Sequence, residues 1–170
     1  MKPEMGWHFI REDGKLGHND GCKVRAGELL KYRGKEPIAL CQAGMHASRN
    51  ILDALQFAPG PVICRVELRG EIVRGDDKSV ATERYCHWML TPEQSGMVLC
   101  HFARWCALRV IHQWKAPDVV VQWLLTGDES LWAAARAAAR VAQSRYLVRC
   151  ATLVHDGKPL PKLRMPKDAK

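Results

Sequence analysis

Two kinds of hydrophobic pattern divide the chain near residue 90. Before it, short apolar runs are bounded by glycine and proline, as in GWHFI (6–10) and VICRVEL (62–68). In VICRVEL apolar and polar positions alternate, which is the period of a half-buried strand. SVATERYCHWML (79–90) is β-branched and aromatic enough for one more strand. After Thr91 the apolar positions recur at helical spacing.

Local turn and capping signals give further boundaries in the first part. Ser48 can cap a short helix whose apolar face contains Ile51 and Leu55, with a stop at the Pro-Gly-Pro of 59–61. Residues 26–37 mix helix formers with glycine and proline, so they suit a turn of helix and a loop better than a strand. The segment 37–42, PIALCQ, is expected to be a strand.

Three helices are predicted in the second part. Thr91 to Gln94 place a capping hydroxyl, a proline at the first helical position and a glutamine at the third, so a long and largely buried helix should run to about Lys115. A shorter helix follows Pro117 and stops at Gly127. The last helix has a narrow stripe of Trp132, Ala135, Ala139, Ala142, Tyr146, Cys150 and Leu153.

These elements predict an α+β protein with a small, mainly antiparallel N-terminal sheet, one short helix and three C-terminal helices. We expect one continuous domain, in which a β-rich region (1–90) is covered by a helical region (91–154). A basic, proline-containing tail (155–170) follows.

Composition agrees with an ordinary globular protein. The 170 residues are 47% hydrophobic and 26% charged, which is far from the composition of disordered chains. No apolar run approaches the roughly 20 residues of a membrane span. The seven cysteines form no CxxC pair and no signal peptide precedes them, so we expect reduced, mostly buried thiols and a cytoplasmic location.

Positive charge is concentrated at the C-terminal end. Residues 133–170 hold nine Lys and Arg against two Asp, which is seven of the eight net positive charges. One interpretation is a solvated helix face with a soluble tail. The other is a surface for nucleic acid or an acidic protein. Its residues would be Arg136, Arg140, Arg145, Arg149, Lys158 and Lys162. A homo-oligomer is left open.

Candidate chemistry is limited. Cys86-His87 and Cys100-His101 are adjacent pairs, and adjacent residues point in different directions, so no metal site is expected. Ser48, two residues after His46 at a helix start, would suit a phosphate. The alternative is an ordinary cap beside a surface histidine. Several polar residues should gather on one edge of the sheet: His8, Tyr32, His46, Ser48, Asp77, Lys78 and Arg84.

The residues from Cys41 to Arg84 carry a resemblance. The pattern C-x-x-G-[LM]-H-A-S…D-A-L…A-P-G…R-V…G…D-K…A-T-x-R is similar to that of a family of small bacteriophage and prophage proteins, over roughly residues 30 to 145. That resemblance implies the cytoplasm of a host cell. The matching residues are Gly44, His46, Ser48, Asp53, Asp77, Lys78 and Arg84.

A looser similarity is to the ADP-ribosyltransferase-like fold, including RNA 2′-phosphotransferases. The segments Trp7–Phe9, Gly44–Ser48, Asp53–Leu55 and Val62–Gly70 follow the order of that fold. The similarity implies NAD as cofactor. It also implies cofactor binding by His8, Tyr32, Lys78 and Arg84, and catalytic roles for His46, Ser48, Glu83 and Asp77.

Two functions follow from these observations. The first is a small basic phage-type binding protein, which engages nucleic acid or a nucleic-acid-handling host or defence complex through its Arg-rich last helix. The alternative is an ADP-ribosyltransferase-like, NAD-using transferase that acts on nucleic acid or protein. Whether the protein is an enzyme is left open.

Overall fold

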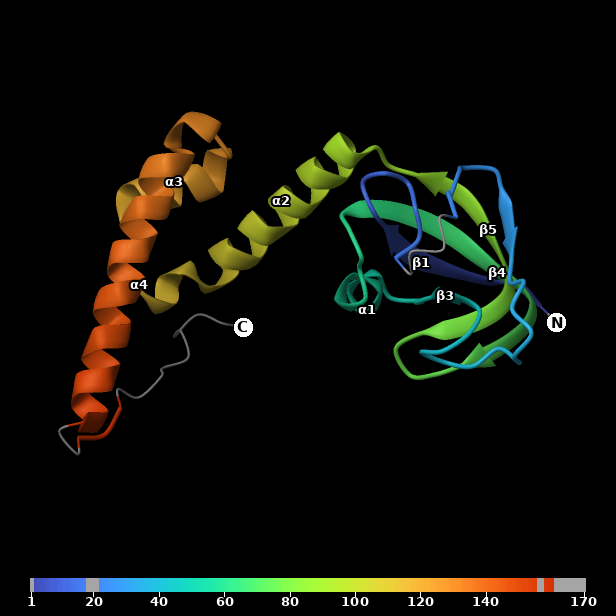
Figure 1. The fold of residues 1–170 in the computed structure, drawn as a ribbon. Coiled ribbons are helices and arrows are strands. Elements are labelled where there is room, and N and C mark those ends of the chain that lie inside the picture. Colours follow the sequence, from blue (N-terminus) through green and yellow to red (C-terminus); the bar gives the residue numbers. More distant parts are fainter. Residues whose placement is uncertain (1, 18–21, 156–157, 161–170) are drawn as a thin grey trace. The chain divides into compact units, whose positions relative to one another are not determined.

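The computed structural model describes residues 2–17, 22–155 and 158–160, and the chain forms two compact units, Met1–Leu99 and Cys100–Lys170. The first contains an antiparallel sheet and the second is helical (Figure 1), so the predicted α+β class is confirmed. The boundary between the units lies inside the first long helix, not at residue 90. Packing of the helical region on the sheet stays a prediction. No helix in the described part of the chain has the length and apolar content that a membrane crossing requires.

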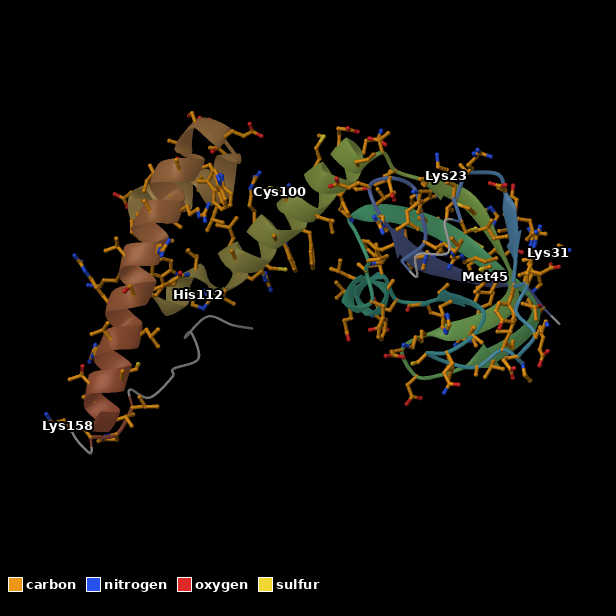
Figure 2. All side chains as sticks on the ribbon, viewed as in Figure 1. Lys23, Lys31, Met45, Cys100, His112 and Lys158 are labelled. Carbon is orange, nitrogen blue, oxygen red and sulfur yellow. The ribbon has the colours of Figure 1, made fainter. Side chains whose placement is uncertain are left out.

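Five antiparallel strands build the sheet of the first unit: β1 (Glu4–Ile10), β2 (Leu29–Lys31), β3 (Met45–Ala47), β4 (Val62–Arg74) and β5 (Ser79–Met89). Their order is β1-β4-β5-β2, and β3 also pairs with β5. Lys31 lies on β2 and Met45 on β3 (Figure 2). β4 and β5 are the long central strands, and each of the other three strands pairs with one of them.

The sheet curls until β3 reaches β1. A register shift between Arg69 and Ile72, with Gly70 at φ 76°, bends β4 and β5 so that the start of β5 pairs with β3. The next residue, Ser48, then exchanges two backbone hydrogen bonds with Trp7 of β1, at 2.7 and 3.0 Å. Gly6 permits this approach, since a Cβ there would lie 3.0 Å from Ala47 Cβ. The result is a barrel-like closure.

The two faces of the curled sheet are packed differently. Inside lie Val62, Cys64, Val66, Leu68 and Ile72 of β4 with Ile10, Ala47, Ala81 and Cys86. Outside, α1 (Ile51–Gln56) follows β3 and, with Leu90 and Leu99, covers Phe9 and Ile63. Ile63 also donates its backbone N–H to Ser95 Oγ at 3.1 Å. The expected alternation of β4 therefore holds only beyond Ile63, where Arg65 and Glu67 are half-buried.

Three helices carry the C-terminal part: α2 (Pro92–Val110), α3 (Asp118–Thr126) and α4 (Trp132–His155). The predicted capping box exists, because Thr91 N–H donates to Gln94 Oε1 at 3.0 Å and Gln94 N–H to Thr91 Oγ1 at 3.2 Å. Gly127 ends α3 in the left-handed conformation, as expected. In the second unit, Val120 and Leu124 of α3 pack on Ala135 of α4. Ala135 and Ala139 of the predicted stripe therefore pack with α3.

Several local predictions are wrong. Leu29–Lys31 is a strand because it pairs with Glu83–Tyr85 of β5, a partner that local sequence does not reveal. The segment 38–43 is a turn closed by an Ala39–Ala43 bridge instead of a strand. The cap of α1 is Asn50, whose side chain accepts from Leu52 N–H, so Ser48 belongs to the strand end.

Burial also differs from expectation. In α2 only Ser95 is fully buried, while Met97 and Trp105 are 74% and 54% exposed. Leu99 packs against the sheet of the first unit, and Leu108 packs against α3 within the second unit. The cysteines are free, but only Cys64 and Cys86 are buried. Apolar character alone therefore overestimated the burial of this half of the chain.

Candidate functional site

A cleft of about 390 Å³ opens in the first unit beside β3. Its walls come from β1, the segment 41–48, α1 and β5. Five of the predicted site residues line it together: His8, His46, Ser48, Lys78 and Arg84. The curl of the sheet explains this convergence, because it brings β1, β3 and β5 around one interior.

Arg84 is the most deeply buried charge in the cleft wall. The residue is 3% exposed, and its Nη1 donates to the carbonyl oxygen of His46 at 2.6 Å. Its side chain points inward because it lies two residues before the buried Cys86, on the same face of β5, whereas its neighbour Glu83 faces outward. A buried cation is costly unless an anion or several acceptors offset its desolvation.

Arg84 also acts on two thiols behind the cleft. The pKa of the Cys86 thiol is lowered by its hydrogen bond with Cys64 and by the positive charge of Arg84. The pKa of the Cys64 thiol is raised by the same hydrogen bond and by burial. Arg84 thus keeps a positive potential inside the barrel.

His46 organises the loop at the cleft edge. Cys41 donates its N–H to His46 Nε2 at 3.1 Å, so in the neutral ring the proton sits on Nδ1, which lies 3.1 Å from the carbonyl oxygen of Gly44. These bonds hold a backbone in which Cys41 has φ 64° and Gly44 has φ 116°. Transferring a proton at either nitrogen would break one of them. The geometry therefore gives His46 a structural role in this loop and does not favour a catalytic one.

Ser48 and His8 lie on facing strands of the closure. Ser48 is 2% exposed, and its backbone is paired with Trp7. Since Asn50 caps α1, Ser48 is not the phosphate-binding helix cap that the sequence suggested. His8 is half-buried in β1 opposite Cys64. Both residues line the cleft.

Lys78 and Phe57 stand together at the cleft. The Lys78 ammonium lies 3.6 Å from the centroid of the Phe57 ring, which is 48% exposed. Among the described lining residues there is no Asp or Glu. Lys78 and Arg84 therefore give the cleft a preference for negatively charged ligands.

Three predicted site residues do not line the cleft. Glu83 forms an ion pair with Lys31 at 2.8 Å. Tyr32 follows β2, where its N–H donates to the carbonyl oxygen of Thr82. Asp77 lies in the turn between β4 and β5. Their assignment to catalysis or cofactor binding stays a prediction that this arrangement does not favour.

Sequence reasoning missed the aromatic walls, Trp7 and Phe57. Trp7 reaches the cleft because its strand is joined to Ser48, which no local pattern indicates. Phe57 had a signal, since it stands between the end of a short amphipathic helix and a Pro-Gly turn.

The basic residues of the second unit form a separate feature. Arg136, Arg140, Arg145 and Arg149 are all exposed on α4, a helix without any acidic residue. Lys158 is exposed past the end of α4 (Figure 2), and Lys162 lies outside the described residues. Within the described ranges, no group of three or more His, Cys, Asp or Glu is arranged to hold a metal ion.

Comparison with known proteins gives one match. The family model described as "Domain of unknown function (DUF7666)" covers residues 8–95, more than half of the chain. Neither a curated protein nor a solved structure matches. The matched region contains every residue that lines the cleft except Trp7, and it ends before α3 and α4.

Proposed function

The chain belongs to the DUF7666 family of domains of unknown function through residues 8–95, and we propose that the cleft in this region binds a nucleotide by its phosphate groups. The observation that carries the proposal is Arg84, which is 3% exposed in the wall of a cleft whose described lining residues include no Asp or Glu. The basic helix α4 lies outside the matched region, so the property common to the family is better sought in the cleft.

The charge of the cleft selects the ligand class. Arg84 and Lys78 supply two cationic groups at one cleft, and charge-assisted hydrogen bonds from such groups are the stronger ones in proteins. Because the described lining residues include no carboxylate, a cationic ligand would find no counter-charge among them. An anionic group on the ligand would instead meet the charges of Lys78 and Arg84.

The rest of the wall favours a nucleotide over a bare anion. The volume of about 390 Å³ falls in the range of small-molecule sites. Trp7, Phe57 and Ala54 give apolar and aromatic surface, which phosphate alone would leave uncovered. A base and ribose would fill it. NAD is the first ligand to test, because the resemblance to the ADP-ribosyltransferase-like fold names it.

Any reaction on the bound nucleotide would depend on His8. Glu83 and Asp77 are not in the cleft wall, and both ring nitrogens of His46 serve the loop. Among the described lining residues, His8 is then the other histidine that could move a proton. Chromatographic detection of nicotinamide released from NAD distinguishes a transferase from a binding protein.

Calorimetric titration tests the proposal. NAD, ADP-ribose, ATP and inorganic phosphate are titrated into the full chain at low salt. We expect at least one nucleotide to bind better than phosphate. Lys78→Met, which keeps the length of a half-buried side chain, should weaken binding by about tenfold or more. The matched control is Lys31→Met, on the same sheet but away from the cleft. The proposal is refuted if no nucleotide gives heat, or if Lys78→Met and the natural protein bind nucleotide with equal affinity.

A second candidate function rests on α4. Its four exposed arginines, with no acidic residue between Trp132 and His155, favour a nucleic-acid or acidic protein partner, as the sequence predicted. Replacement of all four by Ala should abolish the steep salt dependence of nucleic-acid binding. Binding without salt dependence contradicts this candidate. A bacteriophage origin and a cytoplasmic location stay predictions.

A further inference from the structure

The outer face of the sheet is only partly covered. α1 and the first turns of α2 pack over Phe9 and Ile63, but the strands continue beyond them. This uncovered part of β4 and β5, together with Trp7 of β1, carries aromatic rings and guanidinium groups. We call it the Arg-aromatic face, formed by Trp7, Arg65, Arg69, Tyr85, His87 and Trp88.

A β-bulge builds this face. Arg65 lies opposite Trp88, whereas the next residue, Val66, lies opposite Cys86, so His87 is an extra residue of β5. The bulge lets two successive side chains reach solvent: the side chain of His87 is 36% exposed and Trp88 is 42% exposed. Bulges commonly re-aim side chains next to functional sites.

The rings and cations of the face are held in fixed pairs. Arg65 lies over the ring of Trp7, with Cζ 4.6 Å from the centroid, and donates to the carbonyl oxygen of Gly6. Trp88 meets the same ring edge-on at 5.7 Å. Arg65 therefore lies between two indoles in a row across three strands.

A second group of contacts on the same face also pairs an arginine with an aromatic ring. Arg69 lies 4.6 Å over the centroid of Tyr85, and Glu67 holds its guanidinium through two hydrogen bonds of 3.0 and 3.2 Å. His87 contacts Tyr85 edge-on at 4.9 Å and Glu67 at 2.7 Å. Strong cation–π pairs occur about once per 70–80 residues in proteins. Two on one sheet face of this size indicate a surface built for planar, anionic partners.

We propose that the Arg-aromatic face binds single-stranded nucleic acid, with bases stacked on Trp88 and on the Arg69 guanidinium over Tyr85, and a phosphate at Arg65. Exposed rings on a sheet stack unpaired bases whatever their sequence, and adjacent cations neutralise the backbone. Arg65 forms no ion pair with a carboxylate among the described residues, so its charge is available to a phosphate.

Other occupants fit this chemistry less well. An apolar protein surface would have to bury Arg65, Arg69 and Glu67 together, and desolvating three charges is costly. A duplex hides its bases, so it could use the arginines but not the rings. A single strand satisfies both kinds of group. The inference does not depend on α4 or on the nucleotide cleft, because Arg65, Tyr85 and Trp88 do not line that cleft; of the Arg-aromatic face, Trp7 alone also belongs to the cleft wall.

Fluorescence anisotropy with labelled RNA and DNA oligonucleotides and the full chain tests the proposal. Trp88→Ala should weaken binding of the single strand by about tenfold or more. Trp105→Ala is the matched control, since this tryptophan on α2 is 54% exposed and should leave affinity unchanged. The duplex of the same sequence should bind less tightly and be insensitive to Trp88→Ala. Circular dichroism confirms that each variant is folded.

A second variant separates stacking from simple charge. Arg65→Lys keeps the positive charge but loses the planar group over Trp7, so the single strand should bind several-fold less tightly while its salt dependence is retained. Equal affinities of Trp88→Ala and the natural protein, or loss of binding only when the four α4 arginines are replaced, would overturn the proposal. Loss on Trp88→Ala with unchanged nucleotide heats supports it independently of the cleft.

Discussion

Glu4 offers the sharpest test of how the barrel-like closure is held. Its carboxylate, 11% exposed, accepts from Arg49 at 2.9 and 3.0 Å, from Arg74 at 2.8 Å and from Ser79 Oγ at 3.0 Å. Arg49 follows β3, whereas Arg74 and Ser79 flank the β4–β5 turn. One side chain of β1 therefore ties together the segments that surround the cleft. We predict that Glu4→Gln destabilises the first unit.

The magnitude follows from the pKa of Glu4. Hydrogen bonds from Arg49, Arg74 and Ser79 lower that pKa from 4.5 to about 2, against the opposing effect of burial. A fall of that size corresponds to about 3 kcal/mol of preference for the charged form. Arg49 and Arg74 are 66% and 48% exposed, so solvent screening reduces the expected loss for Glu4→Gln to about 1–2 kcal/mol.

The pH dependence has a definite sign. Because folding lowers the pKa of Glu4, the stabilisation is fully present above about pH 4.5 and is lost as the pH falls toward 2. The difference in stability between Glu4→Gln and the natural protein should therefore be large at neutral pH and shrink toward pH 2. Glu4→Gln should also weaken nucleotide binding in the cleft at neutral pH, because it loosens the closure.

Urea unfolding of both proteins at several pH values measures this difference. Glu71→Gln is the matched control, an exposed carboxylate on the same sheet for which the structure shows no ion pair among the described residues. Its loss should change stability by less than about 0.5 kcal/mol. Equal stability of Glu4→Gln and the natural protein at neutral pH, or a difference that does not change with pH, would refute the reasoning.

Three further predictions concern the closure, the cleft loop and the helix cap. Gly6→Ala places a Cβ 3.0 Å from Ala47 Cβ and 3.1 Å from the Ser48 carbonyl oxygen, so thermal unfolding should show a loss of about 1–3 kcal/mol of stability. Gly96→Ala is the control: it has open space around it inside α2 and should be neutral or stabilise the protein by up to about 1 kcal/mol. His46→Phe removes the acceptor for Cys41 N–H and should increase hydrogen exchange of residues 41–44 by about fivefold or more; unchanged exchange would contradict the role assigned to the ring. Thr91→Ala removes the hydroxyl that accepts from Gln94 N–H and should cost about 1 kcal/mol of stability in urea unfolding, with Thr126→Ala near the end of α3 as the comparison.

As with the fold, part of the candidate site was predictable from the sequence and part was not. His8, His46, Ser48, Lys78 and Arg84 were expected to gather, and they do, because each lies at a strand or turn that the curl brings inward. Their individual roles were less predictable. Which nitrogen of His46 carries the proton depends on the backbone of a loop that the sequence pattern assigned in part to a strand.

Strand parity could have excluded one residue. Glu83 and Arg84 are neighbours on β5, and neighbours in a strand point to opposite faces. Once Cys86 is placed in the interior, Arg84 must lie inside and Glu83 outside, where Lys31 pairs with it. The polar residues that gather in sequence therefore do not all gather in space.

The sequence by itself determined the elements whose signals are local. The Thr91–Gln94 capping box, the stop at Gly127 and the alternation of β4 beyond Ile63 act over a few residues, so they were predicted correctly. Tertiary structure alone decided the strand β2, the Trp7–Ser48 closure and the bulge that exposes His87 and Trp88. Each of these depends on a hydrogen-bonding partner distant in the chain, and the free energy of that pairing outweighs local propensity.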